Sequence, residues 1–269
     1  MSDHPQGAQI DDGSAPGEDP FEEIGTEDGF LEHEEPDLLK QHRKLLESEG
    51  YRAVSLMDRV KRIAFVFQGN AAQYLALVSK LQDPGFSLPI MDVRNPAAHD
   101  DLLSEAERLL HNVLTGMSTR IDQQRNFMRR YFSDDAALTS EHRERISSVF
   151  IGDLQATFMK DLRNYITHDQ LPVAQSSQAF SSQAISITLI LPSGPLLTWK
   201  SWSSGVKEWI MSCGEAVPIV DVVDGYARKA AAVDEWLFSR IASKYASEIR
   251  DFRQAQAAYM SEYSRVFGV

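Results

Sequence analysis

Several features that define large classes of proteins are missing from this sequence. Its 269 residues contain one cysteine, Cys213, which excludes an internal disulfide and any metal site built from several cysteines. The longest nearly apolar run, residues 185–191, is far too short to span a bilayer. The chain does not open on a basic segment followed by an apolar one, so nothing predicts secretion. We therefore expect a cytoplasmic protein that makes no contact with a membrane.

Most short signatures of enzymes are missing as well. The sequence contains no Walker-type glycine loop, no His-Glu-x-x-His and no Gly-x-Ser-x-Gly. No two histidines have metal-binding spacing, and the sequence predicts neither a metal nor a cofactor. His42, His111 and His142 stand alone on helical patterns, which is typical of surface histidines or of satisfied, partly buried ones.

Basic residues are absent from the first 35 positions, and this absence decides how the net charge is distributed. Residues 1–35 contain 12 carboxylates, and the first basic residue is Lys40. Because the whole chain has 39 acidic and 27 basic side chains, residues 36–269 hold 27 of each. The net charge of −12 therefore belongs entirely to the N-terminal segment. The acidity of the chain is then no argument against a nucleic-acid partner.

This acidic segment has the composition of a disordered tail. It has three prolines, five glycines and few apolar residues, so it cannot bury enough surface to order itself. One interpretation is a solvated extension. In the other, the carboxylates mimic a phosphate backbone and shield a basic site. The tail would then inhibit the protein itself, and the alternative source of inhibition is a separate regulatory partner. The residues that would dock are Phe21, Ile24, Phe30 and Leu31.

The hydrophobic pattern of residues 36–269 predicts a single, mainly α domain built as a bundle of long helices. Apolar residues recur there at spacings of three, four and seven. Gly50 is the candidate break in the first helix, residues 84–89 are expected to form a loop, and Asn95-Pro96 predicts a capped N-terminus. The expected helices cover residues 37–80, 96–132, 139–168, 205–211 and 217–267.

The spacing changes after the third long helix. Residues 185–191 alternate between apolar and polar side chains, which predicts a strand, and the next four residues, 192–195, predict a turn. Leu196, Leu197 and Trp199 would form the second strand. We therefore expect a small β-hairpin near residues 183–202, appended to the bundle after the helix that ends near His168.

One segment, at the end of the predicted helix 139–168, carries candidate chemistry. There Arg163-Asn164 is followed by His168, and an asparagine in a helix interior is unfavourable by propensity. The segment resembles the Arg-polar-x-x-x-His motif of the HEPN superfamily. These helical domains occur in many prokaryotic RNA-cleaving toxins and phage-defence proteins, and their motif lies on a late helix of a bundle.

The resemblance implies an endoribonuclease that works without a metal, as a toxin or phage-defence effector. His168 would act as general acid or base on the 2′-hydroxyl and the leaving oxygen. Arg163 would hold the scissile phosphate, and Asn164 would orient the arginine or the phosphate. Because the chemistry uses the 2′-hydroxyl, RNA is the expected substrate.

Two side chains five residues apart do not converge on one phosphate from a single ideal helix. Arg163 and His168 lie about 140° apart around the axis and about 7.5 Å apart along it. Either the helix distorts, or a second copy supplies the missing partner. The resemblance implies the second solution, a composite site at a homodimer interface.

Two other interpretations stay open. The chain could keep this fold as a dimeric adaptor that binds a nucleotide or a protein without catalysis, or it could be an unrelated helical interaction protein. A second match, Arg94-Asn95 followed by His99, has a structural explanation as a helix N-terminus but remains the rival site. A cluster of arginines on one helix is expected to bind nucleic acid, the alternative being a solvated helix face. Its members are Arg120, Arg125, Arg129 and Arg130.

Overall fold

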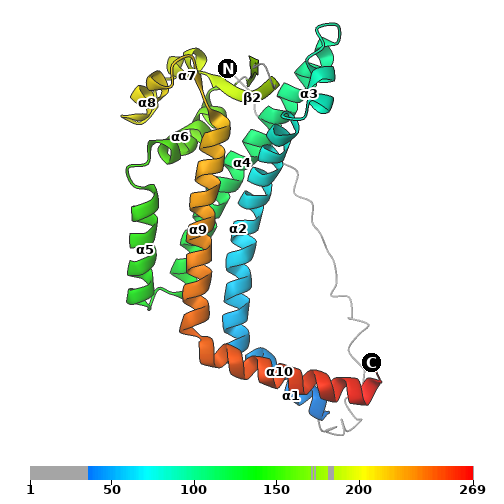
Figure 1. Cartoon of the computed structure of the whole chain (residues 1–269). Coiled ribbons are helices and arrows are strands. Elements are labelled where there is room, and N and C mark those ends of the chain that lie inside the picture. The colour runs from blue at the N-terminus through cyan, green and yellow to red at the C-terminus, as the bar shows by residue number, and fades with distance from the viewer. Residues whose placement is uncertain (1–35, 171, 173, 181–184, 269) are drawn as a thin grey trace, which may run out of the picture.

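The computed structural model describes residues 36–170, 172, 174–180 and 185–268. The predicted acidic tail, residues 1–35, lies outside them. The mainly α prediction is confirmed, because the described residues form helices and a small three-stranded antiparallel sheet. Three long helices lie side by side along the molecule (Figure 1). They are α2 (Glu49–Lys80), α4 (Pro96–Tyr131) and α9 (Ile219–Lys244).

Close packing of α2 against α4 depends on a glycine. A Cβ atom on Gly116 would lie 3.0 Å from the Nδ2 atom of Asn70 and 3.3 Å from the Cα atom of Phe67. Phe67 is fully buried between the helices and meets the ring of Tyr226, on α9, edge to face at 5.5 Å. The three helices thus share a large apolar core over part of their length, and a second, smaller apolar cluster lies between them nearer to α1 and α10.

Two further helices cross the lower end of this bundle in Figure 1. They are α1 (Asp37–Glu47) and α10 (Ala246–Phe267). The predicted division of the first helix is confirmed, but it lies at Ser48 and not at Gly50; the Ser48 hydroxyl caps α2 by accepting from the Tyr51 amide at 3.1 Å. Gly50 instead permits contact with α10: its Cβ atom would lie 2.1 Å from the Glu248 carbonyl oxygen. The expected helix over residues 217–267 is likewise two helices, which meet at Tyr245.

The predicted helix over residues 139–168 also forms two elements, α5 (Ala136–Phe150) and α6 (Leu154–His168). Between them Gly152 adopts a left-handed conformation with φ of 80°, which ends α5. The Asp153 carboxylate then caps α6 by accepting from the backbone amides of Gln155 and Ala156, at 3.0 and 3.2 Å. The segment expected to be a loop near residue 84 forms the short helix α3 (Pro84–Ile90), capped by Asp83.

The sheet differs from the predicted hairpin in its pairing. Strand β2 (Ile185–Pro192) forms as expected, but it pairs with the preceding β1 (Gln175–Phe180) and with β3 (Ala216–Val217). The expected second strand does not form: Leu196 and Leu197 belong to helix α7 (Ser193–Thr198), Trp199 follows its last residue, and α8 (Val206–Ser212) comes next. Pro195 explains the difference, because a proline has no amide for a strand ladder but fits the first turn of a helix.

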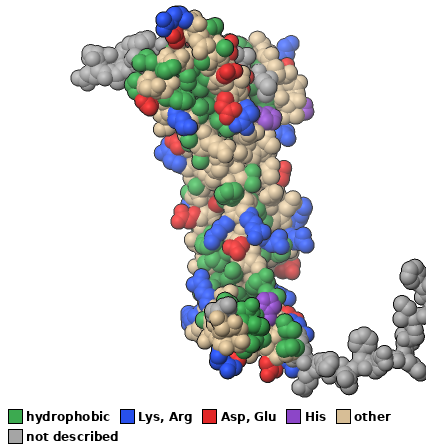
Figure 2. All heavy atoms as spheres, turned by 90° about the vertical axis from the view of Figure 1, so that its right-hand side faces the viewer, with side chains coloured by type: hydrophobic (Ala, Val, Ile, Leu, Met, Phe, Trp, Pro, Cys, Tyr) green, Lys and Arg blue, Asp and Glu red, His purple; other side chains and the backbone are tan. Residues whose placement is uncertain are grey.

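Charges of both signs are intermixed on the side of the molecule that faces away from α5 (Figure 2). Apolar side chains are interspersed among them, and neither sign dominates the visible surface. Within the described residues, no helix combines the length and the apolar character needed to cross a membrane.

Candidate functional site

Helix α6 is held firmly by its apolar side. Phe158, Met159, Leu162 and Tyr165 are fully buried there, against α4, α8 and α9. The ring of Trp202 stacks on Phe158 at 5.5 Å and on Tyr165 at 5.9 Å, so this tryptophan is a core residue. A helix anchored by so many large side chains presents its opposite side in a well-defined position.

Polar contacts secure both ends of α6. At its start, Asp153 pairs with Lys229 of α9 in addition to capping the helix. In the middle of the helix, the buried Asp161 also accepts a hydrogen bond from the Ser203 amide at 2.8 Å. The Gln170 side chain donates to the Tyr165 hydroxyl at 2.7 Å, just beyond the last turn.

The predicted catalytic residues lie on the opposite, solvent-facing side of α6. Arg163 and Asn164 are half-buried, and His168, the last residue of the helix, is exposed. An Nη1 atom of Arg163 donates to the Asn164 side-chain oxygen at 3.4 Å, which is consistent with an orienting role for the asparagine. Among the described residues, no carboxylate forms an ion pair with Arg163 or His168.

A groove of about 660 Å³ opens beside this helix, and we call it the α4–α5 groove. It lies between α4 and α5, and residues of α6 and α9 also line it. Its floor is largely apolar, formed by Met117, Ile121, Met128, Ile146 and Phe150. Its cationic residues are Arg120, Arg125, Arg129, Arg143 and Lys160, and none of the described residues that line it is acidic. An apolar floor with cationic residues at its rim suits an anion that has an apolar part.

The groove and the motif share one side of α6. The helix contributes Ala156, Thr157 and Lys160 to the groove. Residues three, four and seven positions apart lie on the same side of a helix. Arg163 follows Lys160 by three positions, and Asn164 follows it by four. The wall of the groove therefore continues directly into the motif, although neither Arg163 nor His168 lines the groove itself.

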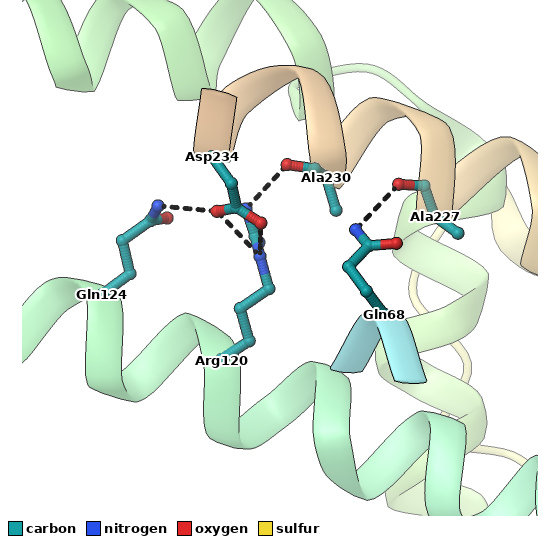
Figure 3. A network of polar contacts seen from close by, with 6 residues as sticks. All are labelled: Gln68, Arg120, Gln124, Ala227, Ala230 and Asp234. Atoms are coloured by element: carbon teal, nitrogen blue, oxygen red, sulfur yellow. Dashed lines mark hydrogen bonds and ion pairs between the residues drawn. The ribbon is translucent and has the colours of Figure 1, made fainter. Parts of the chain in front are cut away.

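Arg120 does not belong to the predicted nucleic-acid-binding surface, because it is only 1% exposed. Its guanidinium binds both carboxylate oxygens of Asp234 on α9, the shortest contact being 2.6 Å, and donates to the Ala230 carbonyl at 3.1 Å (Figure 3). Gln124 donates to the same carboxylate at 3.2 Å. Burial raises the pKa of Asp234, and the hydrogen bonds from Arg120 and Gln124 oppose this shift.

The other predicted arginines of α4 do reach the surface. Arg125 and Arg129 are exposed and line the groove. Arg125 lies 3.7 Å from Asp122, a solvated contact of little strength, and Arg129 donates to the neutral Asn126 side chain. Arg130 is exposed outside the groove and packs over the Tyr131 ring. Sequence reasoning did not connect the first two with Lys160, which belongs to another helix.

His142, which the sequence predicted only as a surface histidine or a satisfied, partly buried one, also lines the groove. Its ring stacks on Trp236 of α9, and its Nε2 atom is buried without a hydrogen-bond partner in the described part of the chain. Burial lowers the pKa of His142, and the positive charge of Arg120 adds to the effect. The His142 ring is therefore uncharged near neutral pH, and in this uncharged form it can hydrogen-bond to a ligand. No local sequence signal marks this position.

The rival motif is engaged in structural contacts. Arg94 forms a bidentate pair with Asp92, with distances of 2.7 to 3.1 Å. Asn95 occupies the N-cap position of α4, as expected, but its side chain makes no capping hydrogen bond. His99 shares a hydrogen bond of 2.9 Å with Ser176 on β1. These contacts favour the copy on α6 as the functional one.

No group of three or more His, Cys, Asp and Glu side chains suited to a metal ion occurs among the described residues. Comparison of the chain with protein-family models, with curated proteins and with solved structures finds no match. The HEPN resemblance therefore depends on the motif and its setting on α6.

Proposed function

We propose that this protein binds RNA along the α4–α5 groove and cleaves it at the motif on α6. The observation that supports the proposal is that groove-lining residues and motif residues lie on the same side of α6. Lys160, at the edge of the groove, is followed by Arg163 and Asn164 at helical spacing. An RNA backbone attracted by the groove's cations would thus be led to the motif. The activity would be that of a cytoplasmic effector of the toxin or phage-defence type.

The chemistry assigned to the motif needs no group beyond its side chains. A guanidinium binds a phosphate through two parallel hydrogen bonds, and within the described residues no carboxylate pairs with Arg163 to compete with that phosphate. His168 would take a proton from the 2′-hydroxyl or give one to the leaving oxygen. Attack of the 2′-oxygen on the adjacent phosphorus would release the 5′-hydroxyl of the next nucleotide and leave a 2′,3′-cyclic phosphate.

A second copy of the chain completes the site in this proposal. The exposed side of α6 carries both Arg163 and His168, on a helix whose other side is buried. Arg163 and His168 of one helix point about 140° apart, so they do not meet within one chain. Antiparallel packing of two such helices would bring Arg163 of one chain toward His168 of the other. The resulting homodimer would contain two equivalent sites.

The decisive assay follows cleavage of single-stranded RNA by the purified chain in EDTA. Arg163→Ala and His168→Ala should each lower the rate by about a hundred-fold or more, the usual contribution of such groups. Arg228→Ala and His111→Ala are matched controls, because both side chains are exposed and outside the groove. Equal rates in all five proteins would reject the assignment.

Mixing the two inactive variants tests the composite site. If each site takes its arginine from one chain and its histidine from the other, a mixed dimer regains one intact site. Equal mixing should then restore about a quarter of the normal rate, because half of the dimers are mixed. No recovery would show that each site is contained within one chain.

A second candidate function is RNA or nucleotide binding without cleavage, as a dimeric adaptor. It is favoured by one observation, that neither Arg163 nor His168 lies in the groove of the single chain. In that case the alanine variants would lose affinity for RNA while the unchanged protein left the RNA intact.

A further inference from the structure

We propose that the α4–α5 groove is also the docking site of the chain's own acidic segment, and that residues 18–24 occupy it. Phe21 and Ile24 would lie on the apolar floor, and the carboxylates beside them would face the cationic rim. The contact itself is independent of RNA cleavage. Its consequence, competition between the segment and RNA, rests on the proposed function.

Charge complementarity is the first argument. The groove is lined by Arg125, Arg129, Arg143 and Lys160 and by no acidic residue among those described. The segment 18–24 has four carboxylates and no cation, whereas residues 36–269 have balanced charges. A concentrated negative segment tethered to the same chain is therefore the natural partner of this rim at low ionic strength.

The floor of the groove supplies the second argument. It is lined by methionine, isoleucine and phenylalanine side chains, among them the buried Met128 and the half-buried Ile146 and Phe150. In the acidic segment Phe21 and Ile24 stand three residues apart between the carboxylates. Adaptable methionines and an aromatic ring can enclose such side chains, which gain free energy by leaving water.

The length of the chain selects these two residues over Phe30 and Leu31. His42 contacts Tyr259 with ring centroids 5.4 Å apart, and Gly50 lies against Glu248, so α1 runs antiparallel to α10. Residue 36 therefore lies near the far end of α10, about 33 Å from the junction with α9. The Asp135–Lys244 pair, at 2.7 Å, joins that junction to the start of α5 and hence to the lower end of the groove.

An extended chain covers this distance only from residues well before the first helix. The 15 residues between Phe21 and residue 36 can span about 50 Å, which is enough to enter the groove. Phe30 and Leu31 are five or six residues from the same point and reach at most about 20 Å. The structure thus distinguishes two apolar pairs of the segment that the sequence treated alike.

The test measures access to the groove in the full-length chain. Ser147, which lines the groove, is replaced by cysteine in a Cys213→Ser background, and the rate of alkylation by N-ethylmaleimide is followed. Phe21→Ser with Ile24→Ser should raise the rate about ten-fold at low salt, and high salt alone should also raise it. Phe30→Ser with Leu31→Ser is the matched control and should leave the rate unchanged.

Three results would overturn the inference. One is a rate that responds neither to Phe21→Ser with Ile24→Ser nor to salt. Another is an equal increase with both pairs of substitutions, which would indicate a diffuse electrostatic effect. A third is protection that fades on dilution, which would place the segment of a second copy in the groove. No RNA is present in this assay, so its outcome does not depend on whether the protein is a ribonuclease.

Discussion

Helices α5 and α6 are both 15 residues long and follow one another in the chain, yet they are held in opposite ways. Helix α6 buries five residues, four of them large and apolar, whereas α5 buries only Leu138. Ion pairs with α9 hold α5 in place: Glu141 with Arg240 at 2.6 Å, and Asp135 with Lys244. A helix held by exposed ion pairs leaves room beside it, and the groove lies there. The firmly packed helix therefore carries the motif, and the helix with few buried residues lines the groove.

The largest effect that separates the two helices should come from their apolar anchors. Phe158→Ala removes a fully buried ring that packs on Trp202 and Trp209, and should lower the free energy of unfolding by about 4 kcal/mol. Leu138→Ala, the matched change on α5, should cost about 2.5 kcal/mol because it empties a smaller cluster. Urea denaturation measures both losses. A larger loss from Leu138→Ala than from Phe158→Ala would show that α5 is the more firmly anchored of the two helices.

The charge pair beneath the groove gives the next effect. Asp234→Ala leaves the Arg120 guanidinium buried without its partner and should cost about 3 kcal/mol in the free energy of unfolding. Replacing both partners, as Arg120→Met with Asp234→Leu, should bring stability back to within about 1 kcal/mol of the unchanged chain. If the double variant is no more stable than the single one, packing around the pair matters more than its charge.

The smallest expected effect is the pH dependence of stability that comes from His142 on α5. Burial lowers the pKa of His142 in the folded chain, so below about pH 6.5 the unfolded chain binds more protons than the folded one. Stability should therefore fall as the pH drops from about 7.5 to about 5.5, and His142→Gln should make this fall smaller. Thermal melting at the two pH values measures the difference. An unchanged fall in the variant would assign the dependence to other groups.

Much of the helical framework could be predicted from the sequence, because apolar residues at helical spacing mark α2, α4 and α6 directly. The break between α5 and α6 was missed, because one helix was predicted over residues 139–168, although Gly152 followed by Asp153 is a local signal for a helix stop and a new N-cap. The break at Tyr245 has no such signal, because residues 240–250 contain neither glycine nor proline. There α10 turns to pack across the base of α2 at Gly50, a contact between distant parts of the chain.

The candidate site divides in the same way. The sequence pattern predicted that Arg163, Asn164 and His168 lie near the end of one helix; that this end of α6 faces solvent is seen only in the structure. Arg120 was misplaced because its partner, Asp234, is 114 positions away. The groove could not be predicted at all, since it depends on how far α5 stands from α4.

The sequence by itself determined the helical periods, the motif and the concentration of all net charge in residues 1–35. These are properties of neighbouring residues, and local spacing is sufficient to express them. Only the tertiary structure decided which arginines are buried, where the long helices turn and how Lys160 comes to link a groove to a motif. Each of these depends on burial and close approach between side chains far apart in the chain, which no local pattern encodes.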